Sequence, residues 1–177
     1  MNDEIGQMPS DRDAERAILG AVLIANHAYY RLGELSAPDF DYAPNRIIFE
    51  AMAYMAEVLR ADDIEPITLK AELQRRGKLE AVGGIAYVTS LMDVVPDVAN
   101  VERYVTIVLR ESKRRRNIKI GNQLARDGMD PANEPEDDAA SAMAALGAIA
   151  TKEDAQARPM AEVLAAAHAK QRVLAAA

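Results

Sequence analysis

Apolar residues recur every three or four positions through long stretches of this chain, and no stretch keeps the alternation of a half-buried strand. The first helical stretch follows Pro9-Ser10-Asp11, a helix-start signal, and the second lies between Asn45 and Arg60. Each keeps its apolar side chains on one face: Ala14, Ala17, Ile18, Ala21, Val22 and Ala25 in the first, and Ile47, Ile48, Ala51, Met52, Met55, Val58 and Leu59 in the second. This periodicity predicts an all-α fold.

Two shorter helices are predicted further along the chain. One runs from Thr68 to Arg76 and is ended by Gly77, and the other runs from Ile85 to Val95 and is ended by Pro96. The connector before the second long helix is rich in turn residues. We expect its Phe40 to fill the core, because an exposed Phe in a loop would waste apolar burial.

The pattern changes at Asn100, which can cap a long helix ending near Gly128. Two prolines mark a turn after that helix, and Asp137–Ala150 is a second helical stretch, so the pair predicts an antiparallel hairpin. The polar segment that follows is typical of a linker, and Pro159 can start a last helix. We therefore expect a globular multi-helix head over residues 1–99, a helical hairpin over 100–150, a linker over 151–158 and a C-terminal linker helix over 159–177.

Composition excludes several kinds of site. The 177 residues contain no cysteine, and His27 and His168 are far apart, so we expect no disulfide, no metal site and no cofactor in this chain. The longest apolar run, Ala17–Ala25, is too short to span a bilayer, and the acidic start does not resemble a signal peptide. These features favour a cytoplasmic protein without a membrane partner.

No phosphate-binding loop is present in the printed sequence. Such a loop needs G-x-x-x-x-G-K-[ST], whereas Gly83-Gly84 precedes Ile85 and Gly77-Lys78 precedes Leu79. We interpret the paired glycines as a tight joint between helices. The acidic pairs and triplets lie in predicted loops or at a helix start, where solvent and the helix dipole suffice to explain them. The chain is therefore expected not to hydrolyse nucleotides.

One dense basic run lies within the long helix. Its cations, Lys113, Arg114, Arg115 and Arg116, are either a solvated helix face or a contact surface for nucleic-acid phosphates. The net charge of −7 and the lack of interleaved aromatic residues favour the first interpretation. On that interpretation the run should matter little for folding.

Four segments resemble, in order and in spacing, the amino-terminal domain of DnaB-type bacterial replicative helicases. They are "DAERAILGAVLIAN", "PDFDYAPNRIIFEAM", "PITLKAELQRRGKLEAVGGIAYVTSL" and "VPDVANVERYVTIVLRE". The resemblance covers Pro9 to Gly128. Two positions depart from the family pattern, Glu65 in place of the usual Asp and Asp97 in place of a frequent Ser, and both should still cap or precede a helix.

The resemblance implies a non-catalytic helical module that pairs with copies of itself into a dimer or trimer-of-dimers collar and recruits a DnaG-type primase. Carried over by position, the primase-facing residues are Tyr87, Ile118 and Leu124. The last helix would dock on a neighbouring ATPase domain, to which ATP and magnesium would belong, and DNA would be contacted only indirectly.

The family's ATPase domain does not follow within these residues. The sequence is therefore either part of a helicase or a stand-alone phage or mobile-element accessory protein. An accessory protein would bind a resident helicase or primase as a loader or regulator. An in-frame phosphate loop downstream of codon 177 would decide for the helicase.

Overall fold

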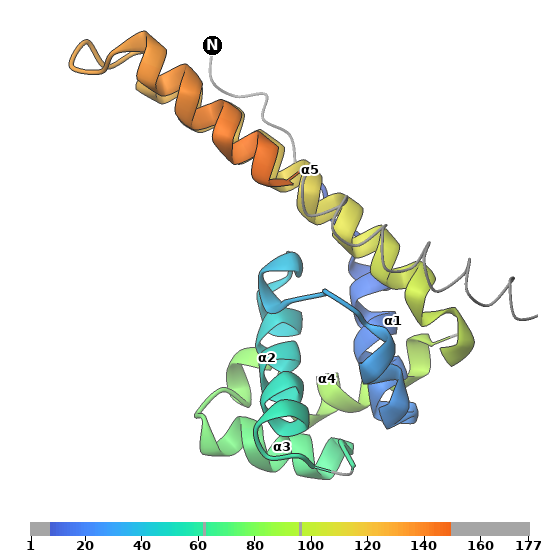
Figure 1. The fold of residues 1–177 in the computed structure, drawn as a ribbon. Coiled ribbons are helices and arrows are strands. Elements are labelled where there is room, and N and C mark those ends of the chain that lie inside the picture. Colours follow the sequence, from blue (N-terminus) through green and yellow to red (C-terminus); the bar gives the residue numbers. More distant parts are fainter. Residues whose placement is uncertain (1–7, 62, 96, 150–177) are drawn as a thin grey trace, which may run out of the picture. The chain divides into compact units, whose positions relative to one another are not determined.

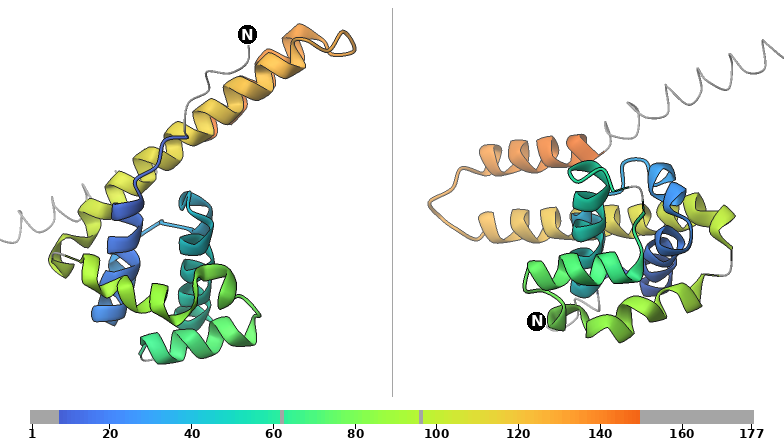
Figure 2. Two further views of the ribbon diagram at one scale, coloured as in Figure 1. Left: turned by 180° about the vertical axis from the view of Figure 1, so that it is seen from behind. Right: turned by 90° about the horizontal axis from the view of Figure 1, so that it is seen from below.

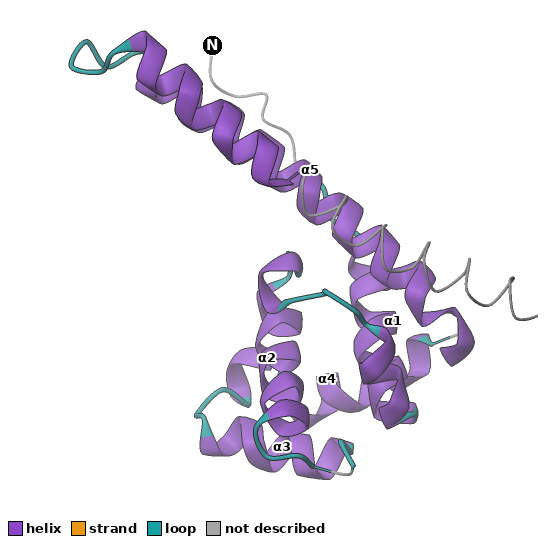
Figure 3. Cartoon of the chain, in the orientation of Figure 1, coloured by secondary structure: helices purple, strands orange, loops and turns teal. Residues whose placement is uncertain are grey.

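The computed structural model describes residues 8–61, 63–95 and 97–149, and every regular element in that part of the chain is a helix (Figures 1 and 3). The predicted all-α class is confirmed. The labelled α-helices are α1 (Arg12–Ile24), α2 (Ala43–Glu57), α3 (Pro66–Arg75), α4 (Gly84–Ser90) and α5 (Val101–Asp127). Short 3-10 turns connect them: η1 (Asn26–Arg31), η2 (Ala37–Asp39), η3 (Glu80–Val82), η4 (Met92–Val94) and η5 (Val98–Asn100).

The chain forms two compact units, which divide between Arg115 and Arg116. We call the described residues through Arg115 the head unit and those from Arg116 the hairpin unit. In the head unit α1 packs on α2 and η4, and α3 packs on α2 and α4 (Figure 1). The division into domains predicted from the sequence stays a prediction.

The start of α1 follows from its first residues. Asp11 accepts a hydrogen bond from the backbone N–H of Ala14 at 2.9 Å, which satisfies one of the free donors at the helix start, as the helix-start signal predicted. Further along, Gly20 is buried, and a Cβ there would lie 2.1 Å from the carbonyl oxygen of Leu91. Glycine thus allows α1 to approach the segment that follows α4.

The core of the head unit is aliphatic with one aromatic pair. Phe40 is fully buried, as predicted, and its ring centroid lies 4.8 Å from that of Phe49. Helices α1, α2 and α3 supply most of the remaining core, including Ile18, Leu19, Val22, Ile48, Met52, Leu69 and Leu73. These side chains come from helices far apart in sequence, so the shared core holds those helices together in the head unit.

Helix α2 ends earlier than predicted, at Glu57 rather than Arg60. Arg60 adopts a left-handed conformation with φ of 50°, and the N–H of Ala61 donates to the carbonyl of Met55 at 3.0 Å. This turn leaves Val58 and Leu59 exposed, so their predicted place on the inward face was wrong.

The helix predicted over Ile85–Val95 is shorter, because α4 ends at Ser90 and a 3-10 turn follows. The hydroxyls of Thr89 and Ser90 donate to carbonyls of the preceding turn and thereby compete with the helical ladder. At the other end, Gly83 and Gly84 have φ of 92° and 70°, which is the tight joint expected of the paired glycines.

The 3-10 turn η5, which precedes α5, is capped by Asp97, and Asn100 is the last residue of that turn. Asp97, not Asn100, accepts from a backbone N–H, that of Ala99 at 2.8 Å, and its other oxygen accepts from the Asn100 side chain. The turn η5 then leads directly into α5. Glu65 also stands at a helix start, where its N–H donates to the hydroxyl of Thr68 at 2.9 Å, so both departures from the family pattern keep the expected role.

The hairpin unit contains the second half of α5 and a helix over residues 135–149 that runs antiparallel beside it (Figure 2). Gly128 follows the end of α5, as expected. Asn133 helps to close the turn by donating to the carbonyl of Asp127 at 3.2 Å. No helix in the described part of the chain is long and apolar enough to cross a membrane. The predicted linker and last helix lie outside the described residues.

Candidate interaction surfaces

Tyr87, the predicted primase-facing residue of the head unit, is half-buried on α4. Its hydroxyl donates to the side-chain oxygen of Asn45 at 2.6 Å, and its ring meets that of Tyr42 edge-on at 6.2 Å. Burial raises the pKa of Tyr87, and the charge of Arg16 opposes that rise. The hydroxyl thus points inward, which leaves part of the ring for a partner.

Beneath Asn45 lies Glu15, whose side chain is almost completely buried. Its carboxylate accepts from the N–H of Asp41 at 2.6 Å and from the Asn45 amide at 2.9 Å. Burial raises the pKa of Glu15, although these hydrogen bonds favour the charged form. Tyr87 is therefore the outer end of a buried polar chain through Asn45 to Glu15.

Sequence reasoning missed this chain of contacts. The available signal was the position of Glu15, three residues before Ile18 and seven before Val22 on the apolar face of α1. An acid on such a face needs hydrogen-bond donors to be tolerated in the core. The donors themselves could not be found from the sequence, because they lie 26 to 30 positions away.

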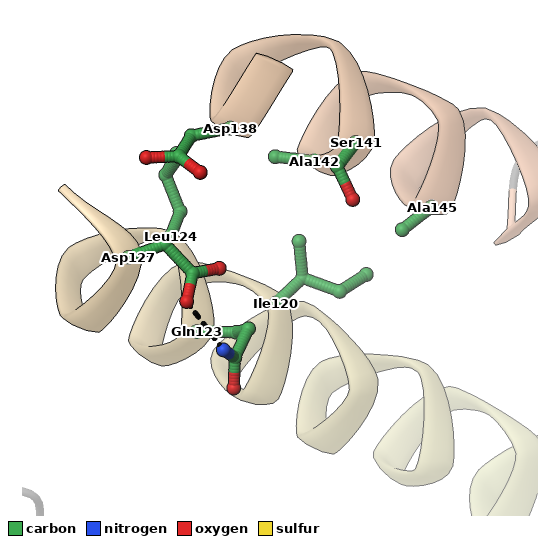
Figure 4. Close-up of a pocket in the computed structure, with 8 residues that line it drawn as sticks. All are labelled: Ile120, Gln123, Leu124, Asp127, Asp138, Ser141, Ala142 and Ala145. Carbon is green, nitrogen blue, oxygen red and sulfur yellow. Dashed lines mark hydrogen bonds between the residues drawn. The ribbon is translucent and has the colours of Figure 1, made fainter. Parts of the chain in front are cut away.

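Ile118 and Leu124, the other two predicted primase-facing residues, belong to the hairpin unit. Ile118 is half-buried and Leu124 is 40% exposed. Leu124 borders a small cavity of about 80 Å³ between the two helices, where Ile120 points from α5 towards the facing helix (Figure 4). The other residues that line it are Gln123, Asp127, Asp138, Ser141, Ala142 and Ala145.

The hairpin unit buries little of its own surface. No residue from 116 to 149 is fully buried, because the contact between its helices is made largely by alanines and by half-exposed residues. Its larger apolar side chains remain in solvent: Leu124 is 40% exposed, Met129 83%, Met143 72% and Leu146 45%. Exposed apolar side chains of this number on a two-helix hairpin are typical of a protein–protein contact.

The basic run is divided between structural and exposed residues. Arg115 is only 8% exposed, and its guanidinium donates to the carbonyls of Pro9, at 2.8 Å, and of Asp39. It also approaches the carboxylate of Asp41 at 3.6 Å. The expectation that the run matters little for folding was therefore wrong at Arg115.

The other cations of the run are more accessible. Arg114 is exposed and pairs with Glu111 at 3.0 Å, and Lys113 and Arg116 are half-buried. A nucleic-acid contact by Lys113, Arg114 and Arg116 stays a prediction, whereas Arg115 is engaged by the head unit in this conformation. Among the described residues no group of three or more His, Cys, Asp and Glu side chains could hold a metal ion.

Comparison with known proteins gives a consistent set of relatives. The sequence pattern of the family described as "DnaB-like helicase N terminal domain" matches residues 7–110. The replicative DNA helicase DnaB of Geobacillus stearothermophilus is 39% identical over 121 residues, 68% of this chain and 26% of that protein. The replicative DNA helicase DnaC of Bacillus subtilis (strain 168) is 34% identical over 138 residues, 77% of this chain and 30% of that protein. The chain thus spans less than a third of the length of these relatives.

Solved structures show the same likeness. The N-terminal domain of DnaB helicase from Mycobacterium tuberculosis has a TM-score of 0.73 and 28% identity, covering 79% of this chain and 98% of that one. A structure of a DnaB-like replicative helicase and its interactions with primase has a TM-score of 0.65 and 20% identity, covering 77% of this chain and 31% of that one. The second similarity concerns the fold alone.

Proposed function

Because the chain belongs to the DnaB-like helicase N-terminal domain family, we propose that it is the non-catalytic N-terminal module of a replicative DNA helicase. In this role it assembles helicase subunits and recruits a DnaG-type primase at the replisome in the cytoplasm. ATP and magnesium would act in an ATPase domain, since the printed sequence contains no phosphate-binding loop.

The assembly role rests on one observation: no residue from 116 to 149 in the hairpin unit is fully buried. Isolated helices of about 15 residues are marginal in water, and most helical stability in proteins comes from packing of an apolar face. The facing helix covers only part of α5, and Met143 and Leu146 extend into solvent. A second copy of the hairpin would supply the missing contacts.

The primase role is supported by the accessibility of the three family positions. Tyr87 presents part of its ring, and Ile118 and Leu124 are half-buried and exposed, respectively. None of the three is fully buried in the core of its own unit. One similar solved protein is described with its interactions with primase, which makes a primase the first partner to test here.

Sedimentation equilibrium of the purified chain tests the assembly role. We expect at least dimers at tens of micromolar, and a predominantly monomeric Leu146→Asp variant, because a carboxylate in an apolar contact is left without a partner. Ile67→Asp is the matched control, since Ile67 is also exposed but lies on α3 of the head unit. A strictly monomeric wild-type chain would contradict the assembly role.

Binding to a purified DnaG-type primase tests the recruitment role. Leu124→Ser and Tyr87→Ala should each weaken binding about tenfold or more, as expected when an apolar side chain is removed from a contact of this kind. Ile67→Ser should bind like the wild type. If Leu124→Ser and Tyr87→Ala bind primase as tightly as the Ile67→Ser control, Leu124 and Tyr87 do not belong to the primase surface.

A further inference from the structure

Two arginines at the start of α1 have no acidic partner among the described residues. Arg12 and Arg16 are four residues apart, so they lie on the same helix face. Neither side chain makes a hydrogen bond or ion pair with another residue that the structure describes. Cations near a helix N-terminus oppose the helix dipole, so helix stability does not explain their presence.

Both arginines lie beside a tyrosine pair. The Arg12 guanidinium carbon lies 4.1 Å from the ring centre of Tyr42, which in turn packs on Tyr87. The charges of Arg16 and Arg12 both reach the Tyr87 phenol, where they oppose the rise that burial causes in its pKa. We call Arg12, Arg16 and Tyr42 the arginine–tyrosine surface.

One atom of this surface is buried without a partner. The Nε of Arg16 is shielded from solvent and has no acceptor among the described residues. The Arg16 side chain as a whole is partly exposed, so a partner would reach its guanidinium through the outer nitrogens rather than through Nε. Guanidinium groups bind carboxylates best, often through two parallel hydrogen bonds. The arginine–tyrosine surface therefore fits an acidic peptide segment.

The hairpin unit contains such a segment. Six acids lie at the turn, with no lysine or arginine anywhere between Asp127 and Thr151. They are Asp127, Asp130, Glu134, Glu136, Asp137 and Asp138, which we call the acidic turn. Burial raises the pKa of Asp138, and the charges of Asp127, Asp137 and Asp130 raise it further. Mutual repulsion of these acids would be relieved by a cationic partner.

We propose that the acidic turn of one copy of this chain binds the arginine–tyrosine surface of a second copy. The inference rests on the self-assembly proposed above and names one contact through which it occurs. Opposite charges on two surfaces of the same chain give a self-complementary interface, as closed dimers require.

Charge reversal in two separate copies tests the contact. One copy carries Arg12→Glu with Arg16→Glu, and the other carries Asp130→Lys with Glu134→Lys. Sedimentation equilibrium should show that each variant alone dimerises at least tenfold more weakly than the wild type. An equimolar mixture should regain the wild-type affinity, since in the mixed dimer each acidic surface faces a basic one.

The control copy carries Arg60→Glu with Arg103→Glu, two exposed arginines that have no ion pair with a described residue. It should dimerise like the wild type, and far-UV circular dichroism should be unchanged for every variant. If the wild type dimerises and the Arg12/Arg16 variant is unaffected, the contact is wrong while assembly stands. A monomeric wild type would contradict both the contact and the assembly role.

Two further outcomes overturn the contact. Loss of dimers without recovery in the mixture would mean that the arginines face some other group. Recovery only when all four substitutions are in one chain would place the contact within a single copy.

Discussion

At the residue scale, two buried glutamates of the head unit have pKa values shifted in opposite directions. Glu15 is held by backbone and amide donors, and burial raises its pKa. The guanidinium of Arg75, with that of Arg76, holds the pKa of Glu72 down to about 2. The difference comes from the partner: a full positive charge in one case and neutral dipoles in the other.

The stability difference between the wild type and a glutamine variant should therefore change with pH in opposite directions at the two positions. A raised folded-state pKa gives stability that is present at low pH and lost as pH rises through it. As pH falls from 7 to about 4, the free energy of unfolding of the wild type should rise relative to that of Glu15→Gln. Over the same change it should fall relative to that of Glu72→Gln. Urea unfolding at both pH values measures this, and the same sign for both variants would refute it.

Arg115 and Arg114 are neighbours in sequence with different roles. Arg115→Gln should destabilise the head unit by about 1–3 kcal/mol, because the carbonyl of Pro9 loses a buried donor and the carboxylate of Asp41 loses its nearest cation. Arg114→Gln removes an exposed pair with Glu111 and should cost less than about 1 kcal/mol. Thermal unfolding of the two variants provides the comparison, and equal losses would argue against the assignment.

These two positions also show the limit of sequence reasoning for single residues. Helical periodicity placed Ile18 and Met52 in the core, because apolar burial is the main driving force of folding and is visible in the residue type. The same periodicity could not separate Arg115 from Arg114. Which arginine is buried depends on the path of the N-terminal segment, which no local pattern encodes.

At the element scale, Gly20 of α1 and Gly121 of α5 differ in how much space surrounds them. Gly20→Ala would bring a Cβ within 2.1 Å of a backbone carbonyl that cannot move freely, so it should destabilise by at least about 1–3 kcal/mol. Gly121→Ala meets no atom within 4 Å and should stabilise α5 by about 0.5–1 kcal/mol. Opposite shifts in melting temperature are expected, and a neutral Gly20→Ala would contradict the close packing of α1.

Helix positions were easier to predict from the sequence than helix ends. Asp11 and the paired glycines were identified correctly, because side-chain capping and left-handed glycine are local effects. The early end of α2 depends on Arg60 in a left-handed conformation, which is rare for arginine and has no sequence signature. The end of α4 was missed because Thr89 and Ser90 were compatible with a longer helix.

At the scale of the whole molecule, the two units differ in how much of their stability is their own. The head unit has a continuous core around Met52, whereas no residue from 116 to 149 is fully buried. Amide exchange of residues 135–149 should therefore slow as protein concentration rises through the dimer range, while residues 48–55 stay protected throughout. Concentration-independent protection of both segments would show that the hairpin unit is stable alone.

The candidate surfaces were only partly accessible to sequence reasoning at this scale. Family resemblance indicated Tyr87, Ile118 and Leu124, and their roles as partner contacts stay predictions. The arginine–tyrosine surface could not be anticipated, because Arg12 and Tyr42 lie 30 positions apart and meet only in the folded head unit. Surfaces of this kind are a product of tertiary packing rather than of local pattern.

The hydrogen bond from Arg115 to Pro9 joins residues 106 positions apart, and this has a consequence for synthesis on the ribosome. Chains emerge at about 5–20 residues per second, so the start of the head unit waits about 5–20 s for its last anchor. During that interval α1 lacks the contact that closes the unit, and its apolar face is available to chaperones. Slowing translation just before codon 115 should prolong this vulnerable period, whereas slowing it after codon 149 should not.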